Sequence, residues 1–159
     1  MIKTLSIPDW HKMAAEGNAP PVRIRLSGYS MNPLIRGCRD YVTVKPVEEE
    51  IVVGDIVLFF GPEKNRYVIH RVWELKEDKV LTWGDNCLKP DGWIMKENVW
   101  GKVVLIERGK RVIHPDPQKG KRWATFWHPL GRIYRFVRRI KQGILYRIRK
   151  MLGKKQQKV

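Results

Sequence analysis

Short strand-like segments, separated by Gly, Pro, Asn and Asp, recur from residue 22 to residue 113 and constrain the fold more than any other feature. In the first segment Val22, Ile24 and Leu26 alternate with two arginines, which is the period of a strand with one buried face. Few long helical periods interrupt this pattern, so the chain predicts a mainly β body. Strands are expected at 22–26, 40–47, 55–60, 66–74 and 79–83, followed by a hairpin over 99–114 that turns at Gly109. The segment at 55–60 is almost entirely apolar and predicts a buried strand.

A short helix is expected before the first strand. Ser6 is a suitable N-cap, Pro8 fits the first turn, and Gly17 lies just past the expected end. A stiff polar linker at 18–21 then leads into the β body. The apolar residues of the helix would share one face and dock on that body: Ile7, Trp10, and Met13 or Ala14.

The positive charge of the chain is concentrated at its C-terminal end. Of 159 residues, 32 are Lys or Arg and 16 are Asp or Glu, which gives a formal net charge of +16. Fourteen basic residues and no acidic residue occur from Lys119 onward, so the preceding part is nearly neutral. Apolar residues recur there at threes and fours, and Pro129 and Gly131 indicate a break, so a basic amphipathic helix is expected over about 130–152.

Three regions follow from these patterns. Residues 1–20 form the N-terminal helix and linker, residues 21–116 the β domain, and residues 117–159 the basic helical tail.

The turn SGYSMNP at 27–33 is the first candidate for chemistry. Gly28 permits close backbone approach or a positive φ, and Pro33 fixes the exit of the turn, so the chain is held sharply around Ser30. A turn that only joins two strands would explain Gly and Pro equally well. Serine is a poor nucleophile at its own pKa, so a catalytic Ser30 requires a neighbouring base.

His70 is the candidate base. It interrupts an apolar row in the expected strand at 66–74, and an imidazole that titrates near neutrality can take a proton from serine. A buried histidine with satisfied hydrogen bonds is the structural alternative. Asp85 and Asp91 lie in the turn-rich segment LTWGDNCLKPDGW, and either could orient the imidazole.

The order of five motifs resembles the successive sequence boxes of the type I signal peptidase superfamily. The motifs are SGYSMNP, GDIVLFF, YVIHRV, TWGDN and NVWGKV, and together they span roughly residues 23–106. The common bacterial branch has a lysine base just before the arginine of the third of these boxes. This chain has His70 there and so resembles the endoplasmic-reticulum and archaeal branch. The resemblance implies the coiled β fold that signal peptidases share with LexA-type self-cleaving repressors.

The resemblance also implies roles for individual residues. Ser30 would be the nucleophile of a serine endopeptidase and His70 its general base. Asp91 would be the carboxylate that holds the imidazole, with Asp85 bracing the loop. The substrate would be a polypeptide, with a peptide or protein precursor as the broad expectation.

Residues beside the nucleophile have supporting roles in this interpretation. The backbone N–H of Ser30 would stabilise the oxyanion, because Gly28 brings no side-chain hydroxyl. Met31 and Tyr29 could line a substrate groove, or they could simply pack beside the turn.

No metal or cofactor is implied by the sequence. Cys38 and Cys87 lie in different turn-like segments and lack the spacing of metal ligands, so free thiols are expected.

Neither a signal peptide nor a membrane span is expected. The N-terminus has polar residues where a signal peptide needs a continuous apolar core, and no stretch approaches the roughly 18 apolar residues of a span. Members of the resembled family usually carry an N-terminal transmembrane anchor, so this protein is expected to be cytoplasmic or peripherally membrane-associated. The tail suits an anionic membrane surface, although it could also pack on the body. Nucleic acid ranks third as a partner, because it gains nothing from an apolar stripe.

Two other functions fit parts of the sequence. A LexA-type self-cleaving regulator shares the fold but uses a lysine base where this chain has His70, and no Ala-Gly or Cys-Gly cleavage site is evident upstream. A non-catalytic membrane-binding or nucleic-acid-binding adaptor would explain the charge, but it would not need Ser30, His70 and Asp91 together.

Overall fold

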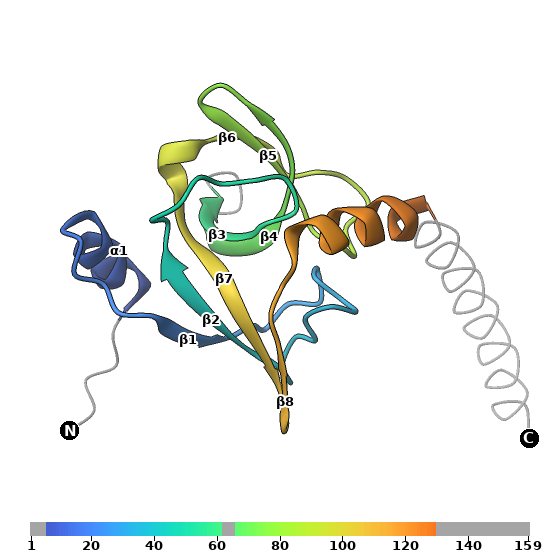
Figure 1. Cartoon of the computed structure of the whole chain (residues 1–159), viewed down its shortest axis with the longest axis horizontal. Coiled ribbons are helices and arrows are strands. Elements are labelled where there is room, and N and C mark those ends of the chain that lie inside the picture. The colour runs from blue at the N-terminus through green and yellow to red at the C-terminus, as the bar shows by residue number, and fades with distance from the viewer. Residues whose placement is uncertain (1–5, 62–65, 130–159) are drawn as a thin grey trace, which may run out of the picture.

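One curled antiparallel sheet, with a helix on either side of it, makes up the computed structural model, which describes residues 6–61 and 66–129 (Figure 1). Neighbouring strands follow the order β1-β2-β7-β3-β4-β5-β6, and β8 pairs with β7. The prediction of a mainly β body is therefore confirmed. The strands are β1 (Val22–Arg25), β2 (Tyr41–Pro46), β3 (Ile56–Gly61), β4 (Arg66–Lys76), β5 (Lys79–Trp83), β6 (Gly92–Met95), β7 (Val99–Arg108) and β8 (Arg111–Ile113), with a 3-10 turn at Lys96–Asn98.

Strand β6 is the one strand of the described residues that the sequence pattern does not predict. It has only four residues and begins at Gly92, whose φ is +100°. So short a segment carries little alternation, and it becomes a strand by pairing with β5.

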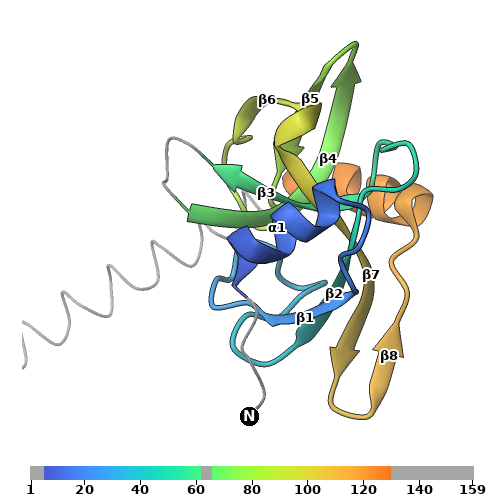
Figure 2. The ribbon, with the colours of Figure 1, turned by 90° about the vertical axis from the view of Figure 1, so that its left-hand side faces the viewer.

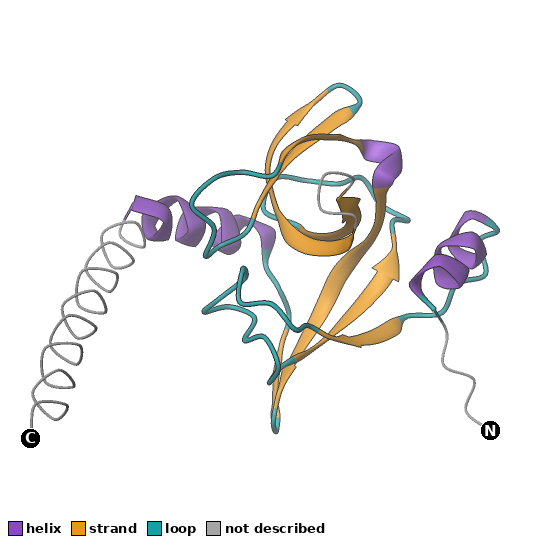
Figure 3. Cartoon of the chain, turned by 180° about the vertical axis from the view of Figure 1, so that it is seen from behind, coloured by secondary structure: helices purple, strands orange, loops and turns teal. Residues whose placement is uncertain are grey.

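The sheet curls because its strands are interrupted by bulges. Pairing is irregular between Thr43 and Val44 in β2, and again at one point in β3 and one in β4. Each bulge bends its strand and increases the local twist. Strand β4, with 11 residues, pairs with β3 through its first half and with β5 through its second half. The sheet therefore wraps round as a half-barrel (Figure 3).

Strand β3 is buried on both faces, as the sequence predicts. Ile56 and Leu58 belong to one apolar cluster, and Val57 and Phe59 belong to a second. Consecutive residues of a strand point to opposite faces, so β3 joins the two clusters into the core. His70 lies opposite Val57 in the register of β3 and β4, which places the candidate base on the face of the second cluster.

Helix α1 (Ile7–Ala15) lies against the sheet (Figure 2). Its buried residue Trp10 docks it there, as expected. The hydroxyl of Ser6 caps it by accepting the N–H of Asp9 at 3.2 Å. The indole Nε1 of Trp10 donates to the carbonyl of Pro20 at 2.7 Å. A Cβ at Gly101 of β7 would lie 2.8 Å from the indole, so the glycine makes room for this ring.

A second helix, at 117–129, begins earlier than the sequence analysis expects. Asp116 caps it by accepting the N–H of Lys119 at 3.0 Å, and Pro117 occupies its first position. Pro129 does not end the helix before residue 129, and the helix expected over 130–152 lies outside the described residues. Within the described ranges, no helix has the length and hydropathy of a membrane span.

Candidate active site

Ser30 lies in the loop between β1 and β2, and the turn that follows β5 holds this loop in place. The backbone N–H of Asn86 donates to the carbonyl of Ser30 at 2.6 Å. The side-chain amide of Asn86 donates to the carbonyl of Tyr29 at 3.2 Å. One residue of the turn therefore fixes two successive carbonyls at the candidate nucleophile.

Gly37, rather than Gly28, is the glycine that the nucleophile loop requires. A Cβ at Gly37 would lie 1.8 Å from the carbonyl oxygen of Gly28, so the two backbones touch there. A Cβ at Gly28 would meet nothing within 4 Å, and Gly28 has no positive φ. Of the two alternatives given for Gly28, the structure shows the close backbone approach and not a positive φ, and the room for this approach comes from Gly37.

His70 and Asp91 form the central pair of the site. His70 Nδ1 lies 2.5 Å from Asp91 Oδ2, and the two side chains are 4% and 7% exposed. Thr82 Oγ1 donates to the same carboxylate oxygen at 3.0 Å, and the backbone N–H of Asp91 donates to the carbonyl of Thr82 at 2.9 Å. Asp91 thus orients the imidazole, and Thr82 orients Asp91.

Gly84 contacts both the backbone of Ser30 and the second nitrogen of the imidazole. A Cβ at Gly84 would lie 2.8 Å from His70 Nε2, 2.9 Å from the carbonyl oxygen of Ser30 and 2.8 Å from Cys87 Sγ. Three groups from three different segments therefore surround one point. Only glycine leaves room for this approach.

Asp85 has a different partner from Asp91. Arg71 Nε and Nη2 donate to the two carboxylate oxygens of Asp85 at 2.9 and 2.8 Å, and both side chains are buried. Arg71 follows His70 in β4, so its side chain points to the opposite face of the strand. Of the two aspartates that the sequence leaves open, Asp91 contacts the imidazole and Asp85 ties its turn to β4 through a bidentate ion pair.

The environment of His70 favours its protonated form. Burial alone would lower the pKa of His70, but the hydrogen bond and charge of Asp91, together with the Cys87 thiol, raise the pKa above its ordinary value of 6.5. The neutral imidazole is consequently a stronger base than a free histidine side chain. Asp91 stabilises the imidazolium that forms when this base takes a proton.

A cavity of about 240 Å³ opens beside Ser30 and His70, between the loop at 26–31 and the first half of β4. Met31 lines this cavity and also belongs to the core at 2% exposure, so it both packs and faces the groove. Over 66–70, β4 pairs with β3 at one edge, whereas pairing with β5 begins only at Arg71. Among the described residues, the second edge of 66–70 thus has no strand partner.

Three further residues of the site are not predicted by the sequence analysis: Thr82, Gly84 and Asn86. Gly84 and Asn86 flank Asp85 in the TWGDN motif, and turn-forming residues at these positions are a usable signal. Thr82 has no such signal, because its contact with Asp91 depends on the register between β5 and β6.

The fold and the site define a mainly β protein in which Ser30 and His70 line one cavity and Asp91 is hydrogen-bonded to His70. No protein-family model matches the chain, and no curated protein matches it. The cysteines Cys38 and Cys87 are free thiols.

Proposed function

We propose that this protein is a serine endopeptidase that cleaves a peptide or protein precursor through Ser30, His70 and Asp91. One observation carries the proposal: the imidazole of His70 is hydrogen-bonded to a buried carboxylate, and His70 lines the same cavity as Ser30. A base oriented in this way beside a turn serine is the arrangement used for acyl transfer.

The residues have distinct roles in the proposed reaction. His70 Nε2 takes the proton of the Ser30 hydroxyl as the serine oxygen attacks the scissile carbonyl, and Asp91 stabilises the resulting imidazolium. The imidazolium then gives the proton to the leaving amine, and a water molecule releases the acyl group from Ser30 by the same route.

The backbone N–H of Ser30 is the proposed oxyanion donor. Among residues 6–61 and 66–129 it donates to no backbone carbonyl, so it is available to the developing oxyanion. One such donor contributes about 3 to 4 kcal/mol to transition-state stabilisation.

An extended polypeptide is the substrate that the cavity fits best. The edge of β4 at 66–70 has no strand partner in the described part of the chain and borders the cavity that contains Ser30. A peptide added to this edge would gain main-chain hydrogen bonds and present its carbonyl groups along the cavity. This mode of binding selects backbone conformation first and side chains second.

The same proposal includes the finer fold assignment and weighs the alternatives. The coiled β fold of signal peptidases and LexA-type repressors is supported by the five ordered motifs and by the curled sheet. A LexA-type regulator would need a lysine base, whereas His70 here is paired with Asp91. A non-catalytic adaptor would have no need for this buried pair.

An anionic membrane surface is the proposed second partner. On the 117–129 helix, Trp123 and Phe126 are 37% and 69% exposed, and the side chain of Lys119 is exposed as well. No acidic residue follows Asp116 in the sequence. Exposed aromatic side chains next to cations are typical of helices that lie at a bilayer interface, so we propose peripheral membrane association.

The proposed activity is tested by replacing the nucleophile. The purified full chain is incubated with peptides of varied sequence, and new termini are detected by mass spectrometry. We expect Ser30→Ala to reduce cleavage by about a thousandfold or more without lowering the melting temperature. Thr125→Ala is the control, since it removes an exposed hydroxyl remote from the cavity. Cleavage by Ser30→Ala at the wild-type rate, or no cleavage by the wild type, would overturn the proposal.

A further inference from the structure

The 117–129 helix has an inner face that packs on the body of the protein. Gly120, Ala124 and His128 are spaced four residues apart and therefore lie on one side of the helix. Ala124 and His128 are buried, whereas Arg122 and Phe126 on the other sides are exposed. The 117–129 helix is thus packed against the rest of the protein along its length and not only at its first residue.

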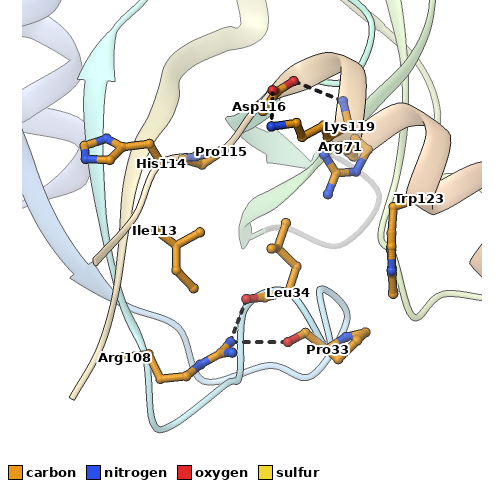
Figure 4. Close-up of a pocket in the computed structure, with 11 residues that line it drawn as sticks. Pro33, Leu34, Arg71, Arg108, Ile113, His114, Pro115, Asp116, Lys119 and Trp123 are labelled. Carbon is orange, nitrogen blue, oxygen red and sulfur yellow. Dashed lines mark hydrogen bonds and ion pairs between the residues drawn. The ribbon is translucent and has the colours of Figure 1, made fainter. Parts of the chain in front are cut away.

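The first contact of the inner face is with Arg71. A Cβ at Gly120 would lie 2.2 Å from Arg71 Nη1, so the helix backbone sits directly on the guanidinium. The same nitrogen donates to the carbonyl of Gly54 at 2.8 Å, and a Cβ at Gly54 would lie 2.0 Å from the carbonyl oxygen of Pro117. Two glycines therefore bring the start of the helix into contact with this arginine. Figure 4 shows Arg71 at the start of the helix, near Asp116 and Lys119.

Arg71 connects this contact to the candidate active site. It follows His70 in β4, and it holds both carboxylate oxygens of Asp85. The residues on either side of Asp85 belong to the turn at 84–87. Gly84 lies against His70 Nε2, and the N–H of Asn86 donates to the carbonyl of Ser30. The helix thus covers the ion pair that holds this turn.

The second contact reaches the other end of the same turn. The ring of His128 lies 4.1 Å from that of Trp83 and 5.1 Å from that of Trp73, measured between centroids. Trp83 Nε1 in turn donates to the carbonyl of Cys87 at 3.1 Å. The turn at 84–87 is therefore connected to the helix both through Arg71 and Asp85 and through Trp83.

Figure 4 shows a cavity between the helix and the loop that carries Ser30. About 390 Å³ of space is lined by Trp123 of the helix and by Pro33 and Leu34 of the loop. The contacts with Arg71 and Trp83 link the helix to the residues around His70.

We propose that the inner face of the 117–129 helix is a positioning surface for the active site: Gly120 and His128 hold the turn at 84–87, and this turn sets the geometry between Ser30 and His70. The catalytic meaning of this inference rests on the proposed peptidase function. Gly120 and His128 are positioning residues, since they act on the site through Arg71 and Trp83. A displacement of about 1 Å between nucleophile and base is enough to reduce a reaction rate severely.

The main test is Gly120→Ala in the full chain, with Gln118→Ala as an exposed control on the same helix. Alanine in a helix ordinarily adds helical stability, so a loss of function would report the contact with Arg71 rather than a weaker helix. We expect kcat to fall about tenfold with KM within twofold of wild type, while Gln118→Ala keeps both constants. Equal kcat in wild type and Gly120→Ala would overturn the inference.

A second measurement does not depend on peptidase activity. The titration of the His70 imidazole is followed by NMR, with Asp91, Cys87 and the Arg71–Asp85 pair as its charged or titratable neighbours. We expect the midpoint in Gly120→Ala to move by about half a pH unit or more from the wild-type value. An unchanged midpoint would contradict the positioning role even if the wild type cleaved no peptide, whereas a shifted midpoint in an inactive wild type would refute only the proposed function.

Three variants at Trp83 and His128 serve if Gly120→Ala does not fold. Trp83→Phe keeps a ring against His128 but removes the donor to Cys87, so kcat should fall several-fold in a folded protein. His128→Phe keeps the aromatic contact and should retain the wild-type kcat, whereas His128→Ala should lose it. Wild-type kcat in both Trp83→Phe and His128→Ala would overturn the inference.

Discussion

At the scale of residues, two neighbouring aspartates serve different purposes because they meet different cations. Asp91 contacts the imidazole of His70 and is itself held by Thr82. Asp85 is neutralised by the guanidinium of Arg71 in a fully buried pair. Asp91 is therefore the carboxylate that can stabilise a protonated His70, whereas Asp85 holds its turn to β4 through Arg71.

Because Asp91 and Asp85 have different partners, Asp91→Asn and Asp85→Asn should change the pH dependence of the activity differently. Wild-type kcat/KM should rise with pH through the raised pKa of His70, because only the neutral imidazole accepts a proton. Asp91→Asn removes the charge that raises this pKa, so the rise should move to lower pH, and the plateau should fall about a thousandfold or more. The measurement is a pH–rate profile from pH 5 to pH 9.

The matched control for that experiment is Asp85→Asn. It should move the rise less than Asp91→Asn does, because Asp85 contacts Arg71 and not the imidazole, but it should lower the free energy of unfolding by about 3 to 5 kcal/mol, because Arg71 loses its partner while buried. If kcat/KM rises at the same pH in wild type and Asp91→Asn, Asp91 is not the group that raises the pKa of His70.

At the scale of elements, the end of β7 fixes the residues that follow the Ser30 turn in the loop between β1 and β2. Asp40 is buried and accepts the N–H of Arg36 at 2.8 Å and the guanidinium Nη2 of Arg108 at 2.7 Å. Arg108, from β7, also donates to the carbonyl of Leu34 at 2.7 Å. The loop that carries Ser30 is therefore fastened to the sheet after its turn, in addition to the hydrogen bonds that Asn86 donates within the turn.

Asp40→Asn should lower the free energy of unfolding at pH 7 by about 2 kcal/mol, because it removes the charge that pairs with Arg108. Burial alone would raise the pKa of Asp40, but Arg108 and the N–H of Arg36 lower it below its ordinary value. The stabilisation is therefore present above pH 3.8 and is lost as the pH falls through the lower folded pKa. Urea unfolding of both proteins at a series of pH values measures the difference.

Glu74→Gln is the control for this comparison, since Glu74 and Lys76 form an exposed pair at 4.0 Å. Its effect should stay below about 1 kcal/mol. If Asp40→Asn is no more harmful than Glu74→Gln at pH 7, the contacts of Asp40 do not hold the loop.

At the scale of the whole molecule, the curl of the sheet brings together segments that are distant in sequence. The loop at 27–33, strand β4 and the segment at 82–91 meet at His70, and the 117–129 helix lies behind them. The positive charge lies on that helix and beyond it in the sequence. The molecule therefore has a nearly neutral β body and a cationic C-terminal part of the sequence.

This charge distribution predicts selective binding to anionic membranes. The full chain should sediment with vesicles that contain phosphatidylserine, poorly with phosphatidylcholine vesicles, and less at high salt, because each basic residue near the surface contributes about 1 kcal/mol and salt screens it. The control is a chain truncated after residue 129, which keeps the docked helix and should bind more weakly while it remains folded. Equal sedimentation with both kinds of vesicle would contradict the proposed membrane partner.

Local sequence patterns determine much of this protein because strands and caps depend on residues only a few positions apart. The alternation at 22–26, the buried run at 55–60 and the cap at Ser6 each predict an element that the structure contains. The Asp116–Pro117 start of the second helix is an equally local signal, which the prediction of a helix over about 130–152 does not include. The ordered motifs also indicate Ser30, His70 and Asp91 from the sequence.

Other features of this protein depend on strand register and on the curl of the sheet, and only the tertiary structure decides them. Strand β6 exists because β5 offers it an edge, and Thr82 meets Asp91 because those two strands pair in one register. The choice between Asp91 and Asp85 follows from the alternation of β4, which sends His70 and Arg71 to opposite faces. The closeness of Gly120 to Arg71, and of Gly37 to Gly28, arises only when distant backbones meet. Long-range contacts of this kind leave no periodic signal in the chain, because they depend on how the whole sheet is bent.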